Sequence, residues 1–124
     1  MLNIRLINKE TGEIIAREIL VADRFWSRLK GLMFTKEMQE HTGLHITPCT
    51  SIHTFFMNYS IDILYLNREK EIVGIEENLA KGKIGKRFKQ VRSVIELPAG
   101  TIKQTSTAIG QTVAFADSEY EKAK

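Results

Sequence analysis

The sequence has little cysteine, little proline and no long apolar run. Cys49 is the only cysteine among 124 residues, so no disulfide within the chain can hold the fold together. No apolar run approaches the roughly 20 residues that a membrane-spanning helix needs, and the first residues alternate where a signal peptide would be continuously apolar. We therefore expect a soluble, cytoplasmic protein whose core is held by packing.

The composition is that of one globular domain. Apolar residues make up 43% of the chain and charged residues 27%, which is close to the usual balance in globular proteins. A chain of this length fits one domain and leaves little room for two. We predict a single β domain over residues 1–116, followed by a frayed polar tail over residues 117–124.

The charge is mildly basic, with a formal net charge of +3, but it is unevenly spread. Residues 81–92 hold six cations and no acidic residue, are interrupted by two glycines, and contain Phe88 as their one aromatic residue. Such a run is typical of a solvated loop and does not indicate nucleic acid, although a module that binds polyanions through it is an alternative. The six cations are Lys81, Lys83, Lys86, Arg87, Lys89 and Arg92.

Many short segments alternate between apolar and polar residues, which is the period of β-strands. Residues 2–7 and 13–21 lie on either side of a turn and predict an N-terminal β-hairpin. Residues 61–66 and 72–75 predict a second hairpin. Further strands are expected at residues 44–47, 91–97 and 111–116.

Helical spacing of apolar residues is confined to short segments between the strands. Asp23 can cap a helix that continues through residues 24–33, and Thr101 can cap another over residues 101–109. Residues 35–42 are a weaker candidate for a helix. Because the strands are many and short, with no regular alternation of strand and helix, we predict a mainly β fold: a single compact jelly-roll-like sandwich or barrel with two short helices.

The segment 48–57 is the least ordinary part of the chain. It has no regular period, and it combines the lone cysteine with a histidine and three consecutive large apolar side chains at residues 55–57. Exposing those three side chains together would leave an apolar surface patch that favours aggregation, so we expect the segment to fold onto the body of the protein. It would then carry Cys49, Ser51 and His53 into a partly buried setting, where their reactivity can change.

Four interpretations of Cys49 and His53 are open. They can be structural, as a buried thiol and an imidazole bonded to backbone. They can line a ligand pocket, in which Ser51 and backbone N–H groups are further hydrogen-bonding groups beside an aromatic surface. They can be a nucleophile and its base. With Asp62 they can bind a metal, although a structural zinc needs four ligands and the chain has one cysteine; we expect no metal and no cofactor.

Three charged residues outside this segment are further candidates. Asp62 interrupts an apolar run. It either belongs to a functional site or has a structural role, in which its carboxylate accepts a hydrogen bond from a loop N–H. Glu96 lies in a predicted strand. It either belongs to a functional site or simply lies on the side of the strand that faces solvent. Arg28 lies on the predicted helix, away from its apolar side, and can anchor a carboxylate or hold carbonyl groups of the 48–57 segment.

Four motifs occur in order along the chain. They are Trp-Ser-Arg-Leu-Lys-Gly-Leu-Met at 26–33, Pro-Cys-Thr-Ser-Ile-His-Thr-Phe-Phe-Met at 48–57, Ile-Asp at 61–62, and Glu-Leu-Pro-Ala-Gly at 96–100. In this combination the chain resembles the small bacterial and archaeal proteins of the family called domain of unknown function 192, over about residues 15–116. The resemblance implies a compact jelly-roll-like β fold with short helical insertions, and it implies no established activity.

The resemblance also marks positions for a site. The family's motif positions fall on Trp26, Arg28, Gly31, Cys49, His53, Phe56, Met57, Asp62, Glu96, Pro98 and Gly100. Relatives often carry proline before residue 91, where this chain has its basic run. The resemblance therefore does not indicate what that loop binds. Our candidate ligand-binding residues are Arg28, Cys49, Ser51, His53, Phe56, Asp62 and Glu96.

The preferred hypothesis from the sequence is a non-catalytic module that binds a small polar ligand or a peptide. The aromatic segment 48–57 with its converging polar groups is the observation behind it. An enzyme that uses Cys49 and His53 is one alternative, and a polyanion-binding module that uses residues 81–92 is the other.

Overall fold

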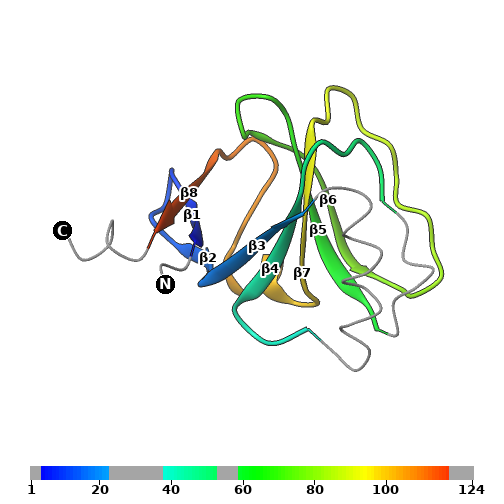
Figure 1. Cartoon of the computed structure of the whole chain (residues 1–124), viewed down its shortest axis with the longest axis horizontal. Helices are drawn as coiled ribbons and strands as arrows, with labels where there is room; N and C mark the ends of the chain where they lie inside the picture. The colour runs from blue at the N-terminus through cyan, green and yellow to red at the C-terminus, as the bar shows by residue number, and fades with distance from the viewer. Residues whose placement is uncertain (1–3, 23–37, 53–58, 118–124) are drawn as a thin grey trace.

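The computed structural model describes residues 4–22, 38–52 and 59–117, in which eight strands and one short helix form two sheets (Figure 1). The elements are β1 (Ile4–Asn8), β2 (Ile14–Ala16), β3 (Glu18–Ala22), β4 (Thr42–Ile46), β5 (Ile61–Leu66), β6 (Ile72–Leu79), β7 (Ser93–Pro98), α2 (Thr101–Gln104) and β8 (Val113–Asp117).

The smaller sheet has the strand order β2-β1-β8, and the larger has the order β3-β4-β7-β5-β6. Strands β3 and β4 pair in parallel, whereas the other strand pairs that the structure describes are antiparallel. In the described residues each sheet keeps two edges, so neither closes into a barrel. The prediction of a mainly β fold with little helix is confirmed.

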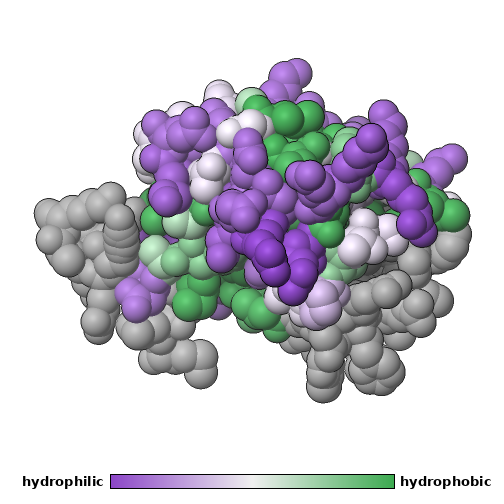
Figure 2. All heavy atoms as spheres, turned by 90° about the horizontal axis from the view of Figure 1, so that it is seen from above, coloured by the Kyte–Doolittle hydropathy of each residue, from purple (hydrophilic) through white to green (hydrophobic). Residues whose placement is uncertain are grey.

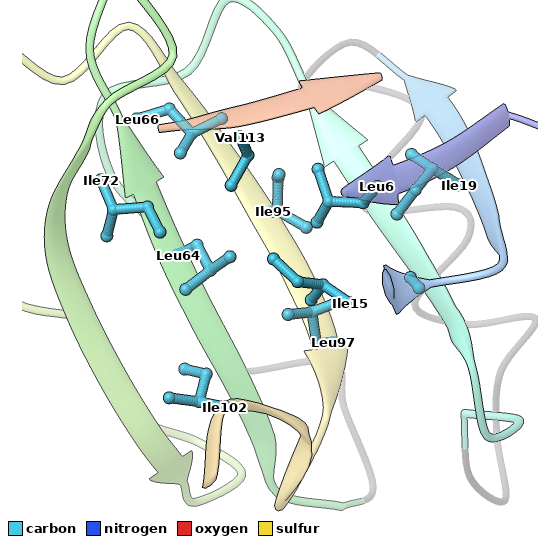
Figure 3. Close-up of a cluster of buried hydrophobic side chains, with 11 residues drawn as sticks. Leu6, Ile15, Ile19, Leu64, Leu66, Ile72, Ile95, Leu97, Ile102 and Val113 are labelled. Carbon is cyan, nitrogen blue, oxygen red and sulfur yellow. The ribbon is translucent and has the colours of Figure 1, made fainter. Parts of the chain in front are cut away.

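One hydrophobic core lies between the two sheets. Figure 3 shows Leu6 and Val113 from the small sheet approaching Leu64 and Ile95 from the large one, with Ile102 of α2 closing one end. These side chains are at most 3% exposed, and burying an aliphatic side chain of this size contributes about 1.5–3 kcal/mol. The packing of the two sheets is therefore the main support of the fold.

A second core covers the opposite face of the large sheet. Successive side chains of a strand point to opposite faces, so Leu64 and Leu66 face the small sheet while Ile61, Ile63 and Tyr65 enter the second core. Every residue of β5 is therefore buried. This explains why residues 61–66 are almost continuously apolar, as is usual for a strand covered on both faces.

The predicted N-terminal hairpin is confirmed only in its first part. Strands β1 and β2 pair antiparallel, but the single strand predicted over residues 13–21 is wrong. Arg17 separates β2 from β3, and β3 joins the other sheet through β4. The backbone N–H groups of Arg17 and Glu18 both donate to the carbonyl of His41, at 2.7 and 3.2 Å, where the chain passes between the sheets.

The other predicted strands are present. Residues 61–66 form β5 and pair with β6, which continues beyond the predicted 72–75 to Leu79. The strands expected at residues 44–47, 91–97 and 111–116 correspond to β4, β7 and β8.

The helix predicted over residues 101–109 is a single turn, α2, and the predicted cap is wrong. The cap residue is Gly100, whose φ of 96° is left-handed, and no side chain caps the helix from there. Ser106 has a φ of 51°, which a right-handed helix cannot continue through. The left-handed backbone on either side confines α2 to one turn.

The other predicted helices lie mainly outside the described residues. This applies to all of residues 24–33 and to most of residues 35–42. Within the second range, residues 38–41 are not helical and Thr42 begins β4, so the predicted helix is wrong there. Among the described residues, no helix is long and apolar enough to cross a membrane.

Candidate functional site

Glu96 lies near the middle of the large sheet. It belongs to β7 and pairs with Leu44 of β4 on one side and Ile63 of β5 on the other. Its side chain therefore shares the face of Ile63 and Leu44, which is turned away from the small sheet. Only 6% of Glu96 is exposed, so the alternative that it faces solvent is wrong.

Burial changes the acidity of Glu96. It raises the pKa of the Glu96 carboxyl from 4.5 to about 7, because the ionised form loses its hydration. Loss of hydration on burial is thus the cause of the raised pKa of Glu96. Buried acids that titrate near neutral pH are frequent in binding and catalytic sites.

Tyr59 lies near enough to Glu96 for the charge of the carboxylate to affect its hydroxyl. Burial, and then the charge of Glu96, raise the pKa of Tyr59 to about 12. Its hydroxyl is buried and has no hydrogen-bond partner among the described residues. Leaving such a group unpaired costs about 1–3 kcal/mol, and a bound molecule that pairs with it would recover that energy.

Tyr65 joins this site to β6 and to the residues that follow it. Its hydroxyl donates a hydrogen bond of 2.6 Å to Oε1 of Glu76, and the backbone N–H of Lys86 donates to the same oxygen at 2.7 Å. Burial first, and then the hydrogen bond to Glu76, raise the pKa of Tyr65. The hydroxyl therefore stays protonated and keeps donating.

Cys49 lies on the same face of the sheet as Glu96. It is buried in the cluster that contains Ile63 and Tyr65, and its backbone N–H donates to the carbonyl of Arg92 at 2.9 Å. Its thiol donates to the carbonyl of Ser51, also at 2.9 Å. A buried thiol that donates its proton has little thiolate character, so this setting favours the structural interpretation of Cys49.

Asp62 lies apart from this group. It pairs with Leu97, one residue out of step with Glu96, so its side chain points to the opposite face of the sheet. It is fully buried and accepts three backbone N–H groups, from Asn78 at 2.8 Å and from Gly100 and Ile102 at 3.0 Å each. These bonds compensate its buried charge and hold the turn that leads into α2.

The structure therefore places Cys49 and Glu96 on one face of the sheet, with the backbone carbonyl of Ser51 bonded to the Cys49 thiol, and places Asp62 on the other face. Arg28, His53 and Phe56 lie outside the described residues. Within the described residues, no group of three His, Cys, Asp or Glu side chains is arranged to hold a metal ion.

Tyr59, Tyr65 and Glu76 were missed by reasoning from the sequence. Tyr65 stands in an apolar run and looks like an ordinary core residue. Glu76 meets it only through the register of the β5–β6 hairpin, in which Ile63 lies opposite Glu76. The available signal was the tyrosine itself, because a buried tyrosine usually needs a partner for its hydroxyl.

Comparison with known proteins gives a family and its relatives. The model of the family DUF192, described as "Uncharacterized ACR", matches residues 6–115. A UPF0127 protein of the archaeon Thermococcus sibiricus is 30% identical over 129 aligned positions, covering 95% of this chain and 79% of that protein. A UPF0127 protein of Pyrococcus furiosus is 29% identical over 115 positions, covering 89% of this chain and 97% of that protein.

Two solved structures from bacteria share the fold. A protein of unknown function from Novosphingobium aromaticivorans aligns with a TM-score of 0.73 at 16% identity, covering 90% of this chain and 83% of that one. A proposed transcription regulator from Sinorhizobium meliloti aligns with a TM-score of 0.71 at 21% identity, covering 92% of each chain. At these identities the likeness extends to the fold alone.

Proposed function

This chain belongs to the DUF192 family, whose function is uncharacterised, and we propose that it is a non-catalytic module that binds a small polar ligand or a peptide through Glu96 and Tyr59. The observation that carries the proposal is the buried Glu96 carboxyl, whose pKa burial raises to about 7, near the buried Tyr59 hydroxyl, which has no hydrogen-bond partner among the described residues. Keeping two such groups in a core costs stability, which is the usual sign of a functional site.

The chemistry of this pair selects a ligand with an ammonium or another strong hydrogen-bond donor. An ionised Glu96 offers only acceptor oxygens, while the Tyr59 hydroxyl offers one donor and one acceptor site. An ammonium against Glu96 would pair with the buried charge and lower the pKa of its carboxyl below about 7. Binding would then release a proton near neutral pH, and affinity would rise as the pH increases through that range.

The other sequence candidates take supporting roles in this proposal. Ser51 and His53 supply polar points near the ligand, Phe56 supplies an apolar floor, and Arg28 holds the 48–57 segment in place. Asp62 acts at a distance as a positioning residue, because its bonds to Gly100 and Ile102 fix the chain just after Glu96. The same proposal includes a jelly-roll-like arrangement of the sheets, a cytoplasmic location, and no role for nucleic acid at this site.

The test uses glycinamide as a probe, because it carries an ammonium and an amide as the start of a peptide does. Calorimetric titration should show binding by the wild type, and repeating it in buffers of different ionisation enthalpy should show proton release. Glu96→Gln should weaken binding at least about tenfold, as expected when a charged partner is removed. The matched control Glu77→Gln removes an exposed carboxylate from β6 and should bind as the wild type does.

Two results would count against the proposal. Equal affinities of the wild type and Glu96→Gln would remove Glu96 from the site. Binding that is also unchanged in His53→Ala would remove the 48–57 segment from it.

A further inference from the structure

Residues 81–92, called here the basic loop, are fixed to the body of the protein at their centre. The backbone N–H of Gly85 donates to the carbonyl of Ile52 at 2.9 Å, and that of Lys86 donates to Glu76 at 2.7 Å. A Cβ atom at Gly85 would collide with the Tyr65 hydroxyl, so the loop approaches the sheet as closely as glycine allows. The basic loop is therefore a shaped surface whose backbone is held in place.

Phe88 provides a second attachment. Its ring lies 4.6 Å from the ring of Tyr65, centre to centre, and it fills the space where a side chain at Gly74 would be. The ring of the one aromatic residue in the basic loop is thus packed against the sheet. The loop has no other ring on which a nucleic-acid base could stack, and such stacking is the usual contact of proteins that hold single strands.

The basic loop accounts for the positive net charge of the protein. It holds six of the eighteen Lys and Arg residues and none of the fifteen Asp and Glu residues, so the rest of the chain has a formal net charge of −3. No acidic residue occurs between Glu77 and Glu96. All six cations of the loop are exposed. The protein therefore presents a positive surface on an otherwise acidic molecule.

An apolar side chain stands among these cations. Ile84 is 70% exposed, which is the largest exposure of any large apolar residue in the described parts of the chain. It directly precedes Gly85, so the backbone that presents it is held against the sheet. Segments that bind a membrane interface combine cations, which meet anionic lipids, with apolar side chains that enter the headgroup region, and this loop offers both kinds of contact.

The C-terminal end of the basic loop lies against the turn after β5. A shallow depression of about 470 Å³ there is lined in part by Arg68, Glu69 and Arg92. The backbone N–H of Arg92 donates to the carbonyl of Leu66 at 2.7 Å, which places the end of the loop beside the turn after β5. Figure 2, which looks onto the side where these turns lie in Figure 1, shows hydrophilic side chains over much of that face.

We propose that the basic loop docks this protein onto an anionic lipid surface, with its cations against the lipid phosphates and Ile84 inserted between the headgroups. Each Lys or Arg near such a surface is attracted by its negative potential, and the attraction weakens with added salt. Insertion of the Ile84 side chain into the lipid adds a hydrophobic contribution to the binding free energy, and salt does not screen this contribution. Docking does not depend on the ligand proposed for Glu96.

Co-sedimentation with vesicles tests this proposal. The wild type should bind vesicles of phosphatidylcholine with about 30% phosphatidylserine and should not bind phosphatidylcholine alone. The triple variant Lys81→Gln, Lys86→Gln, Arg87→Gln should bind at least about tenfold more weakly. The matched control Lys9→Gln, Arg17→Gln, Lys103→Gln removes the same charge from exposed positions elsewhere and should change binding by less than about twofold.

A second pair of variants tests the apolar contact. Ile84→Ser should bind these vesicles at least about threefold more weakly, whereas Ile109→Ser, at a side chain that is 61% exposed outside the loop, should bind as the wild type does. Equal losses in the two triple variants, or an unaffected Ile84→Ser, would overturn the proposal. So would loop-dependent binding of a single-stranded DNA oligonucleotide that displaces the vesicles, since the partner would then be a nucleic acid.

Discussion

At the scale of the residue, Glu96 couples folding to pH. Its pKa is raised from 4.5 to about 7, so the folded protein holds this proton more tightly than the unfolded chain does. Its contribution to stability is fully present below about pH 4.5 and is lost as the pH rises through about 7. The loss is about 3 kcal/mol, because each pKa unit corresponds to about 1.4 kcal/mol.

Glu96→Gln cannot ionise and should remove this dependence. Measured by urea denaturation, the variant should match the wild type near pH 4 and be more stable by up to about 3 kcal/mol near pH 8. The exposed control Glu77→Gln should follow the wild type at both pH values. A difference between Glu96→Gln and the wild type that stays constant with pH would show that Glu96 ionises normally in the folded state.

Cys49 gives a second prediction at this scale. Its thiol is buried and donates to the carbonyl of Ser51, so it should react with iodoacetamide at neutral pH far more slowly than the same thiol in the urea-unfolded chain. Mass spectrometry over time measures both rates. Rapid alkylation of the folded protein would favour the alternative of an enzyme with a Cys49 nucleophile.

At the scale of the element, Asp62 ties β5 to the turn before α2. Asp62→Ala would leave the N–H groups of Asn78, Gly100 and Ile102 without their acceptor. We expect a loss of about 3–5 kcal/mol in unfolding free energy, since three bonds to one buried charge disappear together. Asp62→Asn keeps an acceptor oxygen and should lose less. If Asp62→Ala cost under about 1 kcal/mol, these bonds would not support the fold.

The sequence could predict the elements that local residues determine, but not those boundaries that depend on distant contacts or on backbone conformation. The sequence predicts β5 from a nearly continuous apolar run of strand length and β7 from alternation, because each strand is defined by its own apolar residues. It did not separate β2 from β3 at Arg17, because that break depends on the bonds of Arg17 and Glu18 to a distant His41. The early end of α2 follows from left-handed backbone at Ser106, where the residue type gives no warning.

At the scale of the whole molecule, sheet register decides which candidates meet. Glu96 and Asp62 were both candidates from the sequence, yet Glu96 pairs with Ile63 and Asp62 with Leu97, so their side chains point to opposite faces. Tyr65 and Glu76 entered the site through a pairing that no local pattern contains. The sequence could propose single residues for the site, but their grouping required the arrangement of strands.

The two proposed surfaces are connected through one oxygen atom. Oε1 of Glu76 accepts from the Tyr65 hydroxyl and from the backbone N–H of Lys86, so the basic loop is attached beside the face that carries Glu96. A ligand at Glu96 and a lipid surface at the loop would therefore lie on neighbouring parts of the molecule. The vesicle and glycinamide experiments address the two surfaces separately.

The most direct measurement is a pH titration of the Glu96 side-chain carboxyl carbon by NMR, with and without glycinamide. The free protein should titrate with a midpoint of about 7, and saturating glycinamide should lower that midpoint, because the bound ammonium favours the ionised carboxyl. A midpoint near 4.5 in the free protein, or a midpoint that glycinamide leaves unchanged, would contradict the assignment of Glu96 as the group that recognises the ligand.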